Sequence, residues 1–269
     1  SPQSPASIAL TSVQWSVASG MFRCPPWLSW RRRWELPFRI CSQSTLGQMS
    51  STGSEGAIAS SVEATVALLN THLRQFMEVA EVAKLTKHTA PTDTKSWSQI
   101  IVSSLTGIAG LGRKKGADLI DGSDVKAANL WDAIDTPRFN GVLKTGRLSA
   151  TSHTPDDVSA LDSVPHLFFV LWDYTTDKRP RCRIWVVRCK EDEVFRGIAA
   201  KWYADRAANK TSNNFQLHPP RNKDHDSFSN TWGTLSYPLL FAASYDPADK
   251  TFKVTAYNPD VLTNGTCIP

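Results

Sequence analysis

Two segments of the chain repeat apolar residues every three or four positions, which is the period of an amphipathic helix. The first extends from Ser60 to about Leu85, and its apolar positions are Val62, Val66, Leu69, Leu73, Phe76 and Val79. The second begins near Trp97 and meets Gly110 and Gly112, either of which can end a helix. The pattern therefore predicts two helices in succession.

The second half of the chain is typical of strands with one further helix. Residues 165–172 and 183–188 are apolar runs of strand length, and the first is apolar enough to lie in the middle of a sheet. Helical spacing returns at 194–203, and cations follow it. Further strands are predicted at 214–218, 239–244 and 251–257. This order predicts an α/β or α+β fold, in which helices pack against a sheet.

Residues 1–48 differ from the rest of the chain. They contain four tryptophans, several prolines and many serines, with neither strand alternation nor a helical stripe. This segment lacks the order of a secretory signal, which is a basic start, an apolar stretch and a small-residue cleavage site. Its arginine-rich, serine-rich and acid-poor composition fits an organelle transit peptide better. We favour a third interpretation, in which 1–48 is a disordered extension or upstream sequence ahead of a start at Met49. Residues 49–269 are then expected to form one domain.

The net charge of +5 at pH 7 does not by itself indicate a nucleic-acid partner. Residues 1–48 contain five arginines and one glutamate, so they carry +4 of it and leave the remainder nearly neutral. No window reaches the roughly 18 apolar residues that span a bilayer, so no membrane span is expected. The five cysteines show no CxxC pair and no zinc spacing, which favours reduced thiols in a cytosol. A DNA-binding function therefore has to be argued from local clusters.

A compact hairpin is predicted between Gly116 and Lys126, with its turn at Asp121-Gly122-Ser123. With a two-residue turn, Asp118 and Asp124 would point to opposite faces of the sheet. With a three-residue loop, Asp118 lies opposite Lys126, and the two carboxylates share a face with this lysine. The predicted chemistry depends on the second arrangement.

Two carboxylates and an ammonium on one face suit metal-assisted hydrolysis of a phosphodiester. Asp118 and Asp124 would hold Mg²⁺, and Lys126 would position the attacking water and offset developing charge. Asp121 is the alternative ligand, but its place before Gly122 is typical of a turn residue. An exposed charged hairpin without chemistry is the competing interpretation, since Asp-x-Lys triplets are common on solvated strands.

The order Asp, short hairpin, Asp-x-Lys resembles the PD-(D/E)xK nuclease motif, with Ala117 where proline is usual. The resemblance implies that the Val125 carbonyl is a further metal ligand. Over most of residues 60–259, the chain resembles the MamI-type family of bacterial Type II restriction endonucleases. The segments that carry this resemblance are GRKKGADL, SDVKAANLW, DTPRFN and NFQLHPPR. This resemblance implies a restriction-endonuclease-like mixed β-sheet flanked by helices. It further implies Mg²⁺-dependent cleavage of double-stranded DNA at a short, largely palindromic site, by a homodimer in the bacterial cytoplasm.

Three groups of polar residues are candidates for DNA contact. Arg113, Lys114 and Lys115 form either a phosphate clamp or a solvated loop, and Arg138 and Asn140 lie either in a groove-facing loop or in a polar connection. The third group sits on a segment with two prolines, and it can read base edges or serve only as a rigid turn. Its members are Gln216, His218, Arg221, Asn222 and Lys223.

Two other functions compete with restriction. A DNA-binding or interaction domain would keep the sheet without chemistry, although such a relative would be free to lose the complete Asp118, Asp124 and Lys126 set. A repair-type nuclease would share the chemistry but lack restriction specificity, and nothing in the sequence separates it from a restriction enzyme.

Overall fold

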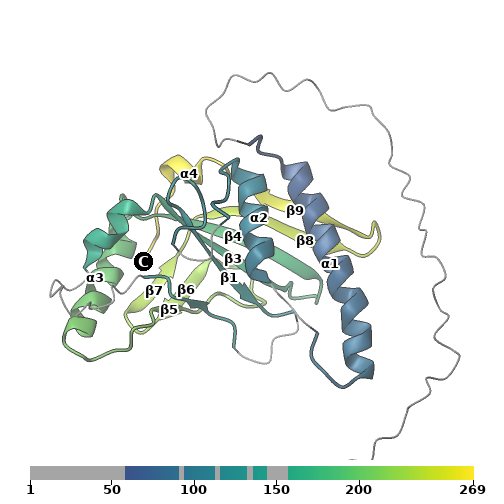
Figure 1. The fold of residues 1–269 in the computed structure, drawn as a ribbon, viewed down its shortest axis with the longest axis horizontal. Coiled ribbons are helices and arrows are strands. Elements are labelled where there is room, and N and C mark those ends of the chain that lie inside the picture. Colours follow the sequence, from purple (N-terminus) through teal and green to yellow (C-terminus); the bar gives the residue numbers. More distant parts are fainter. Residues whose placement is uncertain (1–57, 91–93, 113–115, 132–135, 144–156) are drawn as a thin grey trace, which may run out of the picture. The chain divides into compact units, whose positions relative to one another are not determined.

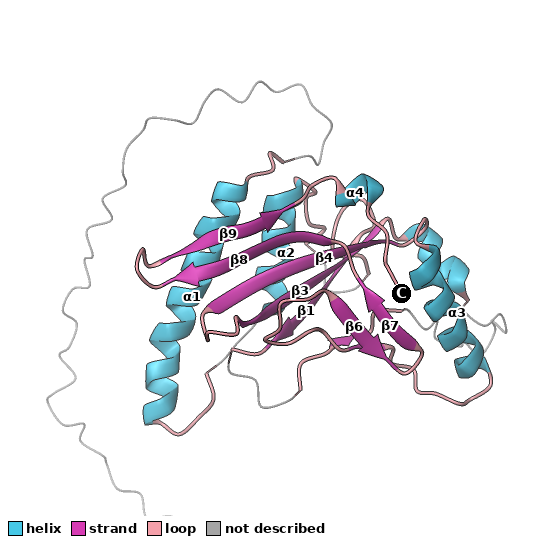
Figure 2. Ribbon diagram, turned by 180° about the vertical axis from the view of Figure 1, so that it is seen from behind, coloured by secondary structure: helices cyan, strands magenta, loops and turns pink. Residues whose placement is uncertain are grey.

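A mixed sheet of five strands, in the order β1-β3-β4-β8-β9, organises the computed structural model (Figures 1 and 2). The strands are β1 Asp124–Asn129, β3 His166–Tyr174, β4 Pro180–Arg188, β8 Leu239–Asp246 and β9 Thr251–Tyr257. β1 runs parallel to β3, and every other pair is antiparallel. The structure describes residues 58–90, 94–112, 116–131, 136–143 and 157–269, so the extension predicted at 1–48 lies outside it. The predicted mixed sheet with flanking helices is confirmed.

Both predicted N-terminal helices are present and lie over one face of this sheet (Figure 1). Helix α1 spans Val62–Leu85 and begins where the Ser61 hydroxyl accepts the N–H of Ala64. Helix α2 spans Thr94–Thr106, so it begins a few residues earlier than its apolar spacing indicated. The apolar stripes of both helices bury against β3 and β4. Within the described residues, no helix is long and apolar enough to cross a membrane.

The other face of the sheet packs against α3 Glu193–Ala207 and four short strands. These strands are β2 Phe139–Asn140, β5 Gln216–Leu217, β6 Ser227–Asn230 and β7 Gly233–Ser236. β2 pairs with β5, β6 pairs with β7, and β2 also contacts β1. In place of the strand predicted at 214–218, the structure has only the two residues of β5. Strands β6 and β7 were not predicted, because serine, asparagine and glycine dominate them. The 3₁₀ helix η1 Val158–Ser163 and helix α4 Val261–Asn264 complete the described fold.

The pairing predicted within the hairpin is wrong. β1 forms its ladder only with β3, and the preceding segment forms a single bridge, from Leu119 back to Gly110. The physical reason is a tight turn: the Ser123 carbonyl accepts the N–H groups of both Asp118 and Leu119. These donors are therefore unavailable to β1, and Asp118 does not lie opposite Lys126 in a ladder.

Candidate active site

The edge strand β1 presents two of the predicted catalytic side chains on one face. Asp124 and Lys126 are two positions apart, so the alternation of a strand points both side chains the same way. The Lys126 Nζ lies 2.7 Å from the Asp124 Oδ2, and the Asp124 side chain is almost fully buried. This close ion pair orients both groups at the start of the strand.

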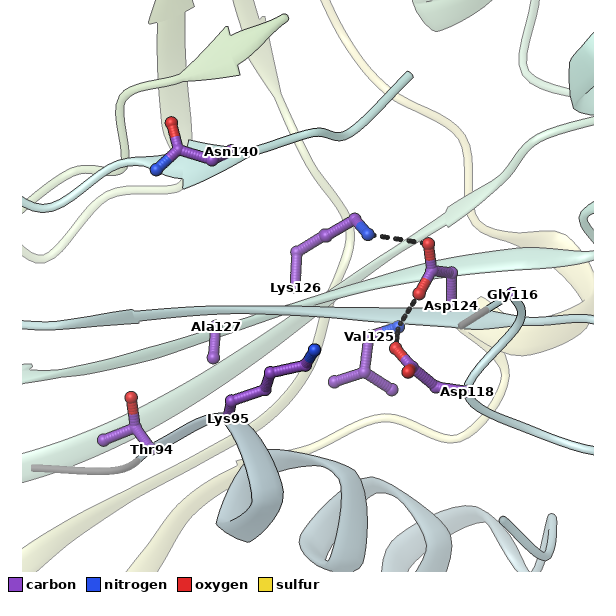
Figure 3. A pocket seen from close by; sticks show the side chains of 9 residues that line it. All are labelled: Thr94, Lys95, Gly116, Asp118, Asp124, Val125, Lys126, Ala127 and Asn140. Carbon is purple, nitrogen blue, oxygen red and sulfur yellow. Dashed lines mark hydrogen bonds and ion pairs between the residues drawn. The ribbon is translucent and has the colours of Figure 1, made fainter. Parts of the chain in front are cut away.

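Asp118 reaches the same place from the loop before β1 (Figure 3). Its Oδ2 accepts the N–H of Val125 at 2.9 Å, and its Oδ1 accepts the Nε2 of Gln99 at 2.6 Å. Asp124 also accepts the Val125 N–H, at 3.1 Å. The two carboxylates therefore meet at one backbone amide on the open edge of β1, although through a loop and not through the predicted hairpin.

The turn that carries Asp118 is held by Asp121. The Asp121 carboxylate accepts both the N–H and the hydroxyl of Ser123, at 2.9 and 2.8 Å. Gly122 closes the turn with a φ of +96°, and a Cβ at that position would lie 3.0 Å from the Ser163 carbonyl. Asp121 is thus a turn residue, as predicted, and it supports the site without facing it.

The environment of Asp118 disfavours its charged form. Burial raises the pKa of Asp118 to about 6, and its hydrogen-bonding and charge interactions with Asp124 add to the rise. The Val125 N–H and Lys126 oppose the shift only in part. Two crowded carboxylates of this kind are stabilised when a cation lies between them.

The oxygen donors at this edge fit a hard divalent cation. Mg²⁺ is commonly held by one or two carboxylates together with waters and substrate phosphate oxygens. Because the N–H and C=O of a strand residue point to the same side, the Val125 carbonyl faces the open edge beside Asp118. Among the described residues, no group of three or more His, Cys, Asp or Glu side chains is placed to hold a metal ion, and the oxygen donors at this edge are two carboxylates and one carbonyl.

A cavity of about 290 Å³ surrounds these groups (Figure 3). It is lined by Thr94, Lys95, Gly116, Asp118, Asp124, Val125, Lys126, Ala127 and Asn140. Lys95, on the first turn of α2, was not predicted because the apolar pattern placed the start of the helix after it. Gln99 was also missed, since a polar residue beside an apolar stripe carries no motif. Only the docking of α2 against β1 brings them to the site.

The predicted DNA contacts fall at two places. Asn140 lines the first cavity, and Arg138 is exposed just before it on the chain, whereas residues 113–115 lie outside the described residues. A second cavity of about 390 Å³ contains His218, Arg221 and Lys223, but it is not lined by any residue of the first. Further residues of the second cavity are Pro219, Pro220, His225, Ser227 and Ser229.

Two predicted contacts are tied to neighbouring structure. Gln216 lies half-buried in β5, where it pairs with Asn140. Asn222 accepts the N–H of Tyr174 through its Oδ1 at 3.2 Å, and its own N–H donates to Asp173. Asn222 therefore has a structural role, and contact of either residue with DNA stays a prediction.

Comparisons with known proteins agree with this geometry. The sequence model of the MamI restriction endonuclease family matches residues 81–250, which include the whole site. The Type II restriction enzyme MamI of Microbacterium ammoniaphilum is 35% identical over 180 residues, which are 62% of this chain and 57% of that enzyme. The chain thus spans little more than half the length of this relative, and no solved structure matches it significantly. With the family model matching well over half of the chain, the chain belongs to the MamI restriction endonuclease family.

Proposed function

We propose that this chain is a Type II restriction endonuclease, which hydrolyses phosphodiester bonds of duplex DNA at a short, largely palindromic site with Mg²⁺. The observation that carries the proposal is the meeting of Asp118 and Asp124 at the Val125 amide, with Lys126 paired to Asp124. Membership of the family supports the reaction class.

Each group has a role in this proposal. The carboxylates of Asp118 and Asp124 and the Val125 carbonyl would hold Mg²⁺, which supplies Lewis-acid polarisation of the phosphate and a bound water of lowered pKa. The Lys126 ammonium, fixed by Asp124, donates hydrogen bonds toward the attacking water and the developing phosphorane charge. Asp118 is aligned before substrate binds, because both of its oxygens already accept hydrogen bonds.

A palindromic site favours a two-fold symmetric dimer. Each half-site then meets the same side chains, and one active site serves each DNA strand. We therefore propose a homodimer that acts on double-stranded DNA in the bacterial cytoplasm.

The test compares the wild-type chain with Asp124→Asn on bacterial genomic DNA, with Mg²⁺ and with a chelator. We expect discrete fragments with one shared end sequence from the wild type only when Mg²⁺ is present. Asp124→Asn should reduce cleavage by about 100-fold or more while duplex binding persists, because a ligand is lost but the phosphate contacts remain. Asp249→Asn, which changes an exposed carboxylate in the β8–β9 turn, is the matched control. Wild-type cutting rates in Asp124→Asn would refute the assignment, and binding without any cutting by the wild type would favour a binding-only protein.

A further inference from the structure

Three charged side chains are buried on the face of the main sheet that also carries Asp124. Asp173 is fully buried, and Arg181 and Arg183 are 5% and 3% exposed. The Asp173 carboxylate accepts Nε and Nη2 of Arg181 at 2.9 and 2.8 Å, and Nη2 of Arg183 at 2.8 Å. We call these three residues the buried arginine cluster.

Several of the remaining arginine donors bond to the backbone of one loop, while Arg181 Nη2 also donates to the Tyr174 carbonyl at 3.2 Å. Arg183 donates to three carbonyls of the loop, those of Pro220, Lys223 and His225, at 2.6, 2.9 and 3.2 Å. Arg181 Nη2 adds a second bond to the Lys223 carbonyl at 3.1 Å. The N–H of Asn222 in turn donates to Asp173 at 3.0 Å. Four positions of the loop are therefore fixed through main-chain atoms.

Side chains at the far end of the loop add two more attachments. Asp224 accepts Nη1 of Arg181 at 2.6 Å, and Asp226 accepts the indole N–H of Trp185 at 2.8 Å. The side chains of Arg221, Lys223 and His225 take no part in these bonds and are exposed at the second cavity. The loop thus combines a fixed backbone with the exposed cations Arg221 and Lys223.

Stability alone does not account for this arrangement. Buried ion pairs are often no more stabilising than apolar residues of the same volume, because desolvation offsets their attraction. Burial also lowers the pKa of Arg183, which Asp173 opposes. The geometric result of the cluster is a loop held in one conformation, and prior fixing of a binding loop reduces the entropy lost when it binds.

The attachment points of the loop and Asp124 lie at opposite ends of the same sheet face. Asp124 pairs with Leu167 at the start of β3, and Asp173 follows Leu167 by six positions. At about 3.3 Å per residue this is about 20 Å along the strand. A B-form duplex covers that length in about six base pairs, so both places can contact one short DNA site.

We propose that Asp173, Arg181 and Arg183 are positioning residues for sequence recognition, which hold the segment from Pro219 to Asp226 so that its exposed side chains meet a fixed set of base pairs. The proposal rests on the proposed function in one respect, namely that the ligand is duplex DNA.

The principal test replaces Arg183 by methionine. Arg183→Met removes the donors to the three loop carbonyls, yet it leaves Asp173 in a one-to-one pair with Arg181, so no buried charge is left without its partner. Asp224→Ala breaks only the outer attachment, at a side chain 65% exposed. Asp249→Ala, which removes a similarly exposed carboxylate elsewhere, is the control.

Two measurements are made on each variant. The first is the rate of trypsin cleavage after Arg221 and Lys223, located by mass spectrometry, which reports whether the loop is fixed. The second compares the cleavage rate at the DNA sequence that the wild-type protein cuts with the binding affinity for a random-sequence duplex. A merely structural role would leave the ratio of these two quantities unchanged.

We expect Arg183→Met to raise the rate of trypsin cleavage in the loop about tenfold and to lower the cleavage-to-binding ratio about tenfold. Asp224→Ala should change both quantities in the same directions but by less. Partial recovery in Arg183→Lys, which restores a cation with fewer donors, would support the proposal. A wild-type cleavage-to-binding ratio in Arg183→Met would overturn it, whatever the trypsin rate. If Arg183→Met does not fold, an unchanged ratio in Asp224→Ala overturns it instead. Absence of cutting by the wild type would defeat the proposed function, while the trypsin rates would still decide whether the cluster fixes the loop.

Discussion

The Asp118 carboxylate accepts the backbone N–H of Val125 at 2.9 Å. This bond links a loop to the open edge of β1, and it places the Asp118 oxygens beside Asp124, which accepts the same N–H. A strand edge normally leaves such donors to water or to another strand. Here the donor aligns the carboxylate that we propose as a metal ligand.

We expect Asp118→Asn to stabilise the metal-free protein at pH 8. Because the pKa of Asp118 is raised from 3.8 in the unfolded chain to about 6, folding stability falls as pH rises from 3.8 through 6 and stays low above it. Asparagine removes this penalty, and Gln99 can present its Oε1 to the new amide. The gain should be about 1 kcal/mol, since partial exposure screens the interaction.

Thermal melts at pH 8 and pH 4, with a chelator and with Mg²⁺, check this prediction. The advantage of Asp118→Asn should be largest at pH 8 and shrink toward pH 4. Mg²⁺ should raise the melting temperature of the wild type more than that of the variant. A variant that melts below the wild type at pH 8 without metal would contradict the crowding of the two carboxylates.

Gln99→Ala is expected to weaken the response to Mg²⁺. Gln99 orients Asp118 through a 2.6 Å hydrogen bond, and loss of such support to a metal ligand typically costs about 10- to 100-fold in metal affinity or activity. The cleavage rate measured against Mg²⁺ concentration should shift to higher concentrations. Gln75→Ala, at an exposed position of α1, should behave as the wild type. An unshifted Mg²⁺ curve in Gln99→Ala would remove this residue from the site.

Arg221→Ala should distinguish base reading from phosphate binding. If Arg221 reads a base, the variant loses about 1–3 kcal/mol of binding to the preferred duplex and little to a scrambled one. A phosphate contact would instead weaken both duplexes equally and reduce the salt dependence. Binding of both duplexes at two salt concentrations measures the difference, and equal losses would make Arg221 a backbone contact.

A chain shortened to begin at Met49 is expected to fold and cut. All helices and strands of the described residues begin at Val62 or later, and the first buried apolar residue is Leu69. Circular dichroism, melting temperature and cleavage rate of the shortened and full chains provide the comparison. Insolubility or inactivity of the shortened chain would show that residues 1–48 belong to the domain.

Much of the fold could be predicted because its elements have strong local patterns. The apolar stripe of α1 has the period of a helix, and residues 167–172 of β3 and 184–187 of β4 are continuous apolar runs. The candidate residues Asp118, Asp124 and Lys126 were also found locally, since a motif within nine positions carries them. In these cases the residues that decide the structure lie close together in the chain.

Only the tertiary structure decided how those residues meet. β1 pairs with β3, whose first residue is 42 positions beyond the first residue of β1, and this parallel pairing replaced the predicted hairpin ladder. Gln99 and Lys95 reach the site because α2 docks on β1. Arg181 and Arg183 lie at alternate positions of β4 and are indistinguishable in the sequence from a solvated strand face, yet they are buried against Asp173 and a distant loop. The physical reason is the same each time: periodicity determines which side of an element is apolar, whereas contacts between distant segments determine which polar groups that side must satisfy.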